Sequence, residues 1–157
     1  GWDFEISDSV TILDNVLPLF SNAVNTSVDF KINSNFTANI TVDNEHLDTY
    51  NFSTNASGGW VTVSRGISGQ QWNASENVTI DVVVDSEVCW FYWANDTTGN
   101  SNQSDTYCFT VVNTVPVISQ IVIQPGAPNT TDDLNCTYSA SDDDSDDLFV
   151  SFDWYVD

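Results

Sequence analysis

Short runs in which apolar and polar residues alternate restrict the fold of this chain more than any other feature. Residues 36–42 read F-T-A-N-I-T-V, and residues 77–84 read N-V-T-I-D-V-V-V. A period of two places successive side chains on opposite faces of a strand, and β-branched and aromatic residues favour strands. Further strands are expected at 27–33, 60–64, 88–94 and 106–112. No stretch has a helical period, so the sequence predicts an all-β sandwich.

A domain boundary is expected near V-V-N-T-V-P-V, residues 111–117, where Pro116 separates two alternating runs. The segment 1–14 is expected to be an N-terminal strand that belongs to or completes a neighbouring domain, and residues 15–114 are expected to form one β-sandwich domain. Residues 115–157 supply three expected strands, at 118–123, 134–138 and 149–156, whereas a complete sandwich needs about seven. The second domain is therefore expected to be incomplete within this chain.

Asparagines that could accept N-linked glycans are far more frequent than chance predicts. Eleven of the seventeen asparagines begin an Asn-x-Ser/Thr triplet, whereas the Ser and Thr content predicts about four. The eleven are Asn25, Asn35, Asn39, Asn51, Asn55, Asn73, Asn77, Asn95, Asn102, Asn129 and Asn135. An occupied asparagine must face solvent, and Asn39 facing outward places Ile40 and Val42 inward, as the apolar pattern requires. The sequence thus predicts an extracellular glycoprotein.

The segment C-W-F-Y-W-A-N-D-T-T-G-N-S-N-Q-S-D-T-Y-C-F, residues 89–109, predicts a hairpin with its turn at T-T-G-N. A regular antiparallel register around this turn places Cys89 opposite Cys108 and Trp93 opposite Ser104. The two cysteines can then bond across the hairpin. Closing a loop of this size stabilises the fold by about 3 kcal/mol, so the expected disulfide is a structural brace.

The same register predicts which residues of this hairpin face solvent. Asn95 is expected opposite Asn102, and because both begin glycan triplets, their face should point outward. Phe91 and Trp93 share that face. They are expected to form either a stacking platform for nearby glycans or a subunit contact, and the contact is favoured.

Two longer stretches resemble the Ig-like repeats of large archaeal cell-surface proteins, a bacterial/archaeal Ig-like, PKD-like or fibronectin-III-like family. They are A-N-I-T-V-D-N-E-H-L-D-T-Y-N-F-S-T-N and E-N-V-T-I-D-V-V-V-D-S-E-V-C-W-F-Y-W-A-N-D-T-T-G-N-S-N-Q-S-D-T-Y-C-F-T-V. The resemblance covers most of residues 26–112. It implies tandem Ig-like β-sandwiches, of which the second begins at residue 115 with an Ig-type Cys136 and Trp154. The usual partner for Cys136 is absent from this sequence.

The acidic loop S-A-S-D-D-D-S-D-D-L-F contains the candidate metal ligands. Asp142, Asp144 and Asp146 alternate between two expected strands, so their carboxylates could converge on one hard cation such as Ca²⁺. The loop also resembles the Asp-x-Asp-Gly-Asp loops of the same repeats, although Ser145 occupies the glycine position. A solvated acidic loop without a metal is the alternative.

Several functional classes are disfavoured. A net charge of −21 with two basic residues argues against nucleic acid as a partner, and no apolar run predicts membrane insertion. His46 is the one histidine and lies among acidic residues in a polar connection, so no catalytic constellation is evident. The chain is therefore expected not to be an enzyme.

These features together predict a structural building block of a cell-surface filament, pilus or S-layer-like coat that self-associates. A cell-surface adhesin or ligand-binding ectodomain is the alternative. The second domain could be completed by further strands of a longer chain, which is favoured. It could instead be completed by a strand that another subunit donates. The N-terminal segment, in which Trp2, Phe4 and Ile6 alternate with polar residues, is the candidate donor and a candidate interface.

Overall fold

The computed structural model describes residues 14–27, 29–144 and 146–155, and this part of the chain consists of strands and loops without a helix. The predicted all-β class is confirmed. The strands are β1 (Leu19–Thr26), β2 (Asn35–Asp43), β3 (Leu47–Thr54), β4 (Val61–Gly66), β5 (Gln71–Thr79), β6 (Glu87–Asp96), β7 (Ser101–Gln103), β8 (Tyr107–Thr110), β9 (Val117–Gln124) and β10 (Asn135–Ser141). Trp2 and Phe4 lie outside the described residues.

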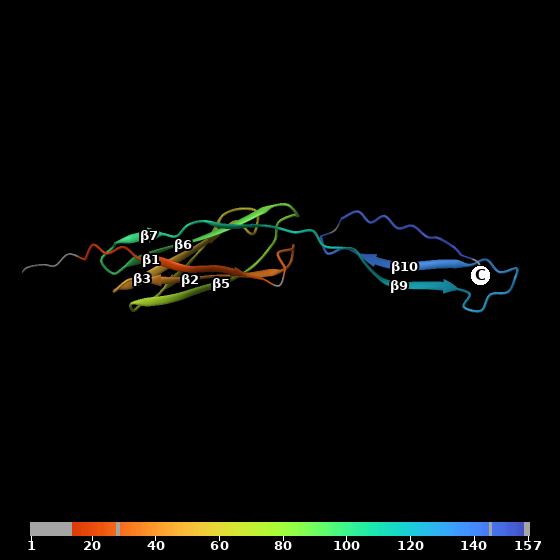
Figure 1. The fold of residues 1–157 in the computed structure, drawn as a ribbon, viewed down its shortest axis with the longest axis horizontal. Coiled ribbons are helices and arrows are strands. Elements are labelled where there is room, and N and C mark those ends of the chain that lie inside the picture. The colour runs from red at the N-terminus through yellow and green to blue at the C-terminus, as the bar shows by residue number, and fades with distance from the viewer. Residues whose placement is uncertain (1–13, 28, 145, 156–157) are drawn as a thin grey trace, which may run out of the picture.

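The strands form three antiparallel sheets. One has the order β1-β2-β5, and the second has the order β4-β3-β6-β7, with β8 also paired to β6. These two sheets face each other, as Figure 1 shows, and enclose a common core. The third sheet is the pair β9-β10, which lies beyond one end of the first two along the long axis of the molecule (Figure 1).

The core lies between the first two sheets and is rich in aromatic residues. The Tyr92 hydroxyl crosses it from β6 and donates a hydrogen bond of 2.9 Å to the Ala38 carbonyl on β2. Alternate residues of β2, β3 and β6 supply most of the buried side chains, as the period of two predicts. The largest of them are Trp90, Tyr92, Phe36, Phe52, Leu47, Ile80, Val42, Val88 and Val111.

Some expected strands are absent or displaced. Residues 29–33 form a connection with a turn at Asn33, whose φ is +61°, and the first strand instead spans residues 19–26. The predicted strand at 77–84 is shifted to β5, and β3 and β7 were not predicted. Residues 149–155 form no strand, so the expectation at 149–156 is wrong for its described part. Residues 29–33 do alternate between apolar and polar. Local hydrogen bonds, such as the one that the Ser34 hydroxyl donates to the Asp29 carbonyl (2.8 Å), take the place of strand pairing there.

The predicted register of the 89–109 hairpin is right at one end and wrong at the other. Cys89 pairs with Cys108, as predicted. Trp93 pairs with Gln103 rather than Ser104. The shift arises because Ser104 and the two residues after it form an irregularity between β7 and β8, where the Ser104 hydroxyl accepts a hydrogen bond of 3.0 Å from the Tyr92 amide. One extra residue moves every later side chain to the opposite face.

A buried carboxylate organises the turn between β6 and β7. Asp96 is 1% exposed, and its Oδ1 accepts hydrogen bonds from the amides of Thr98 and Asn100, each 2.9 Å long. Its Oδ2 accepts from Asn100 Nδ2 at 2.8 Å, and the same amide donates to the Asp14 carbonyl at 3.0 Å. Burial opposes ionisation of Asp96, but the hydrogen bonds from Asn100 and Thr98 outweigh it and lower its pKa from 3.8 to about 2. The turn thereby holds the start of the described chain.

Replacing Asp96 with Asn should cost about 1–3 kcal/mol of unfolding free energy, because an amide NH₂ would face the donors of Thr98 and Asn100. The folded pKa of Asp96 is about 2 and lies below 3.8, so its contribution is complete well above pH 3.8 and is lost as the pH falls toward 2. Urea unfolding at neutral pH and near pH 2 measures the difference. The variant creates an Asn-Thr-Thr triplet, so both proteins should come from a host without N-glycosylation. The exposed Asp105→Asn is the control, and equal stability of D96N and wild type at neutral pH would contradict the prediction.

Candidate functional site

The glycan-acceptor asparagines are spread over all three sheets and the loops. Asn73 and Asn77 lie on the outer face of β5, where Thr41 and Thr37 are their partners on β2. Five of the eleven are exposed, namely Asn35, Asn73, Asn77, Asn129 and Asn135. Six are half-buried, namely Asn25, Asn39, Asn51, Asn55, Asn95 and Asn102. Occupancy by glycans stays a prediction for all of them.

Several of these asparagines use their side chains to hold the fold, Asn55 and Asn95 among them. Asn55 extends the β3-β6 ladder, since its Oδ1 accepts from the Cys89 amide (2.7 Å) and its Nδ2 donates to the Glu87 carbonyl (3.1 Å). Asn95 Nδ2 donates to Asp48 Oδ2 and to the Asp96 carbonyl, at 3.1 and 3.2 Å. A glycan linkage leaves one amide hydrogen on Nδ2, so occupancy at Asn95 would break one of its two bonds.

The prediction that Asn102 faces outward beside Asn95 is wrong. The register shift pairs Asn102 with Ala94, a core residue, and its Nδ2 donates to the Pro18 carbonyl at 2.9 Å. Asn25 is likewise paired with the core residue Ala38. Directly opposed residues of an antiparallel pair share a face, so Asn25 and Asn102 lie on the core side at the sheet edges.

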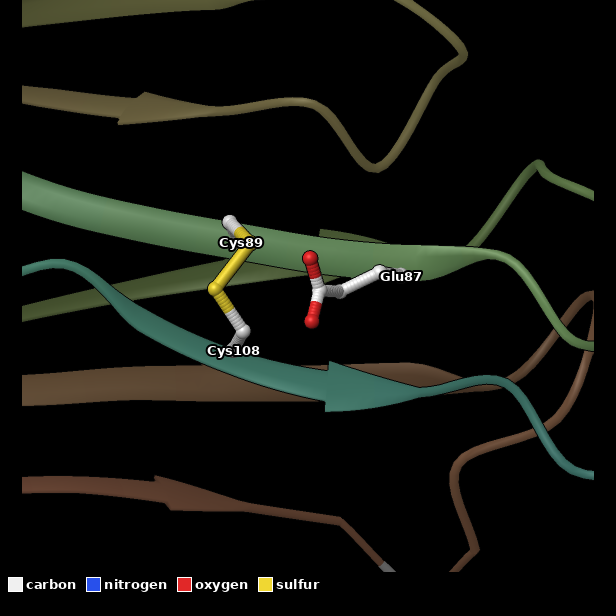
Figure 2. Close-up of side chains that lie close together, drawn as sticks. All are labelled: Glu87, Cys89 and Cys108. Carbon is white, nitrogen blue, oxygen red and sulfur yellow. A yellow bond between two sulfur atoms is a disulfide. The ribbon is translucent and has the colours of Figure 1, made fainter.

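The predicted disulfide joins Cys89 and Cys108, on the outer face of β6 and β8. Glu87, two residues before Cys89, places its carboxylate beside the two sulfurs, as Figure 2 shows. This is the one group of three potential metal ligands among the described residues. Its sulfurs are bonded to each other and are not thiolates, so the group is a brace in the oxidised protein. The negative charge of Glu87 also repels an incoming thiolate.

An ionic contact between exposed Arg65 and buried Glu76 closes the gap between the edge strands β4 and β5. Arg65 Nε donates to Glu76 Oε1 at 2.9 Å, and the Tyr50 hydroxyl donates to the same oxygen at 2.8 Å. The hydrogen bond from Arg65 lowers the pKa of Glu76, while burial and then Glu76 raise that of Tyr50 to about 12. Each group is matched with an opposite or neutral partner, so the contact links the two sheets and provides no free acid or base at neutral pH.

The aromatic residues expected on the outer face of β6 are there, and a third ring joins them. Phe91 and Trp93 are half-buried, and Phe91 packs against Trp60, with ring centroids 5.3 Å apart. Trp60 itself is 55% exposed. It was missed because it follows Gly58-Gly59 in the β3-β4 connection, where only the fold brings it over β6.

The acidic loop after β10 lies against the linker that joins β8 to β9, residues 111–116. Thr114 donates from its amide to Asp144 Oδ2 (2.7 Å) and from its hydroxyl to Asp142 Oδ1 (3.0 Å). The remaining oxygens, Asp142 Oδ2 and Asp144 Oδ1, are buried without a hydrogen-bond partner in the described part of the chain. Contact between the two carboxyl groups raises the pKa of Asp142 and lowers that of Asp144, so the pair shares charge as one unit. Asp146 does not join them in a described group of three ligands.

A cation of the chain itself already contacts this loop. Lys31 Nζ lies 3.2 Å from Asp143 and 3.3 Å from Asp29, so it links the first two sheets to the acidic loop. The contacts of Lys31 with Asp143 and of Thr114 with the acidic loop were missed by sequence reasoning because they join residues 112 and about 30 positions apart. The hydrogen bonds of the two Asp residues raise the pKa of Lys31. The junction therefore depends on charge, and salt should weaken its exposed pairs.

No protein-family model matches this chain, and no curated protein sequence matches it. In the described residues, no helix is long and apolar enough to cross a membrane.

Replacing Cys89 and Cys108 together with Ala should lower the unfolding free energy by about 3 kcal/mol, since the brace restricts an unfolded loop of this size. Urea unfolding of the full chain measures the loss, and reduction of the wild type should reproduce it. The control is Cys136→Ala, which leaves the brace intact and removes the free thiol. A nonreducing peptide map that pairs Cys89 or Cys108 with Cys136 would contradict the assignment.

Calcium should raise the melting temperature if Asp142 and Asp144 bind it, in the ~0.1–1 mM range of extracellular modules. Asp144→Asn should abolish the shift, because it removes one of the two paired carboxylates. The control is Asp146→Asn, which lies outside the pair and should retain most of the shift. An unchanged melting temperature of the wild type in millimolar calcium would reject the site.

Proposed function

We propose that this protein is an extracellular, N-glycosylated building block of a cell-surface polymer, a filament or an S-layer-like coat, made of Ig-like domains. The observation that carries the proposal is the apolar face of the β9-β10 sheet, which is largely exposed although residues 152–154 cover part of it. On that face Ile121 and Ile123 are 61% and 49% exposed, and Tyr138 is 45% exposed. A two-stranded sheet is marginally stable alone, and proteins pair or cover such faces.

The opposite face of the same sheet is mostly polar, so the exposed apolar side chains are gathered on one face. Gln120, Val122, Gln124, Thr137 and Ser139 lie on it, and all of these except Val122 are polar. Phe152 reaches the apolar face, with its ring centroid 5.3 Å from that of Tyr138, but it remains 46% exposed. One polar and one apolar face is the pattern of a sheet that packs on a partner layer. This supports a position within an assembly or a tandem array.

The strand order supports the Ig-like part of the proposal. The first, second and fifth strands form one sheet, and the fourth, third, sixth and seventh strands form the other, with the eighth also paired to the sixth. That order is the one the fibronectin-III-like resemblance implies. Fold resemblance of this kind argues for architecture, and the largely exposed apolar face argues for assembly.

The partner layer can come from further strands of a longer chain or from another copy. The segment 1–13 of the same copy is too short to supply it. Asp14 is held at the Asp96 end of β6, whereas β9 begins beyond the other end of that strand. A segment that starts at Asp14 and runs the length of β6 and then of β9 must span about 55–60 Å at the usual strand rise. Thirteen residues span at most about 45 Å. Donation of this segment would therefore join different copies.

Negative-stain microscopy and light scattering of the glycosylated chain should show filaments or lattices. Ile121→Ser on the apolar face should abolish them, while Gln120→Ser on the polar face of the same strand should not. Deleting residues 1–13 should abolish them only if that segment is the donated strand. Isolated particles of wild type, with I121S unchanged in mass, would reject the polymer and favour the adhesin.

A further inference from the structure

The outer face of the second sheet carries a strip of three aromatic side chains, Trp60, Phe91 and Trp93, which we call the aromatic strip. Trp60 and Phe91 cover one end of it, since their centroids lie 5.3 Å apart and Ser53, which pairs with Phe91, is only 6% exposed. Trp93 continues the strip along β6 and has no aromatic partner within the described residues. Trp93 is half-buried, so part of its side chain stays accessible to a neighbouring group.

Asn51 is the residue directly opposite Trp93 in the β3-β6 ladder. Opposed residues share a face and have Cβ atoms about 4.5–5.5 Å apart. On its other side, Asn51 pairs with Ser64 of β4, which offers no comparable apolar surface. Asn51 begins the triplet Asn-Phe-Ser, so it is both a glycan acceptor by sequence and a neighbour of the indole by register.

Asn95 is the other acceptor on this face, but its amide is engaged. Its Nδ2 donates to Asp48 Oδ2 and to the Asp96 carbonyl, and its Oδ1 is buried. The amide of Asn51 has no such partner among the described residues. Of the two acceptors next to Trp93, Asn51 is therefore the one whose amide can carry a sugar without losing a hydrogen bond.

We propose that Asn51 carries an N-linked glycan whose first sugar stacks on the indole of Trp93 and covers the aromatic strip. The inference rests on the proposed glycoprotein function and names one site and one contact within it. A pyranose ring presents C–H groups on its faces and hydroxyls at its rim, so it can cover an indole while its polar groups stay in water. Trp93 lies on one side of Asn51 and Ser64 on the other. The apolar face of the sugar buries more apolar surface over Trp93 than over Ser64.

This occupant changes the role of the strip from a subunit contact to a shielded surface. The sugar covers Trp93 within one copy, so the strip needs no second protein. Acceptors on the other outer face differ, because Asn77 and Asn73 pair with Thr37 and Thr41. Glycans there have no ring to stack on and project into solvent. Asn77, whose Nδ2 donates to Thr37 Oγ1 at 3.0 Å, therefore serves as the control.

The test uses the full chain from a host that N-glycosylates, with Asn51→Gln and the control Asn77→Gln. Hydroxyl-radical oxidation followed by peptide mass spectrometry reports the accessibility of each tryptophan. Oxidation of Trp93 should rise severalfold in N51Q and stay unchanged in N77Q. Oxidation of Trp72, on β5 of the other sheet, should be the same in all three proteins.

Thermal melting provides a second readout. N51Q should melt a few degrees below wild type, about 4 °C if the contact resembles an aromatic pair in strength. In a Trp93→Ser background the same change should have no effect, because the contact is already lost.

The outcomes that overturn the inference are distinct from those that overturn the glycoprotein. An unmodified Asn51 in a chain whose other acceptors are occupied rejects the inference alone. An occupied Asn51 with equal Trp93 oxidation in wild type and N51Q also rejects it. If none of the eleven acceptors is occupied in native material, the inference and the glycosylated part of the proposed function both fail.

Discussion

The burial of Trp90 and Tyr92 between the two facing sheets is the interaction on which the rest of the structure depends. Both side chains are fully buried, and the Tyr92 hydroxyl donates to the Ala38 carbonyl of the opposite sheet. Burial raises the pKa of Tyr92, so its hydroxyl stays a donor at all physiological pH values. A slip of β6 by one residue would expose both rings and lose several kcal/mol of apolar burial. Because side chains alternate along β6, the inward positions of Trp90 and Tyr92 place Cys89 and Trp93 on the outer face.

Sequence reasoning identified β6 and the disulfide because the alternation in this segment is strong and its cysteines fall on one face. It failed beyond the disulfide because register also depends on irregularities that local pattern does not reveal. Ser104 replaces one backbone group of the ladder with its hydroxyl, and this single exchange moved Asn102 from the outer to the inner side. The expected strand at 27–33 also failed, since its apolar alternation was real but local hydrogen bonds around Ser34 formed a loop.

The candidate sites were partly predictable for a related physical reason. Acceptor triplets and the run of aspartates can be read from the sequence, but their partners lie far away in the chain. Asp142 and Asp144 meet at Thr114, and Trp93 meets Asn51, only through sheet pairing and the linker. Sequence thus predicted the types of chemistry, whereas the structure decided which members of each set lie together. The structure does not group Asp146 with Asp142 and Asp144. It also shows that the Asn95 amide is engaged in hydrogen bonds, whereas that of Asn51 is not within the described residues.

Charge sets the final constraint on how copies of this chain could meet. A net charge of −21 makes any two copies repel each other, and both basic residues are already engaged, Lys31 with Asp143 and Arg65 with Glu76. Attraction between copies cannot therefore come from their cations. It must come from apolar contact or from bound cations that bridge acidic groups. The uncharged apolar side chains of the β9-β10 face, Ile121 above all, supply the first, and glycans on the outer faces would leave that face as the surface where contact overcomes repulsion.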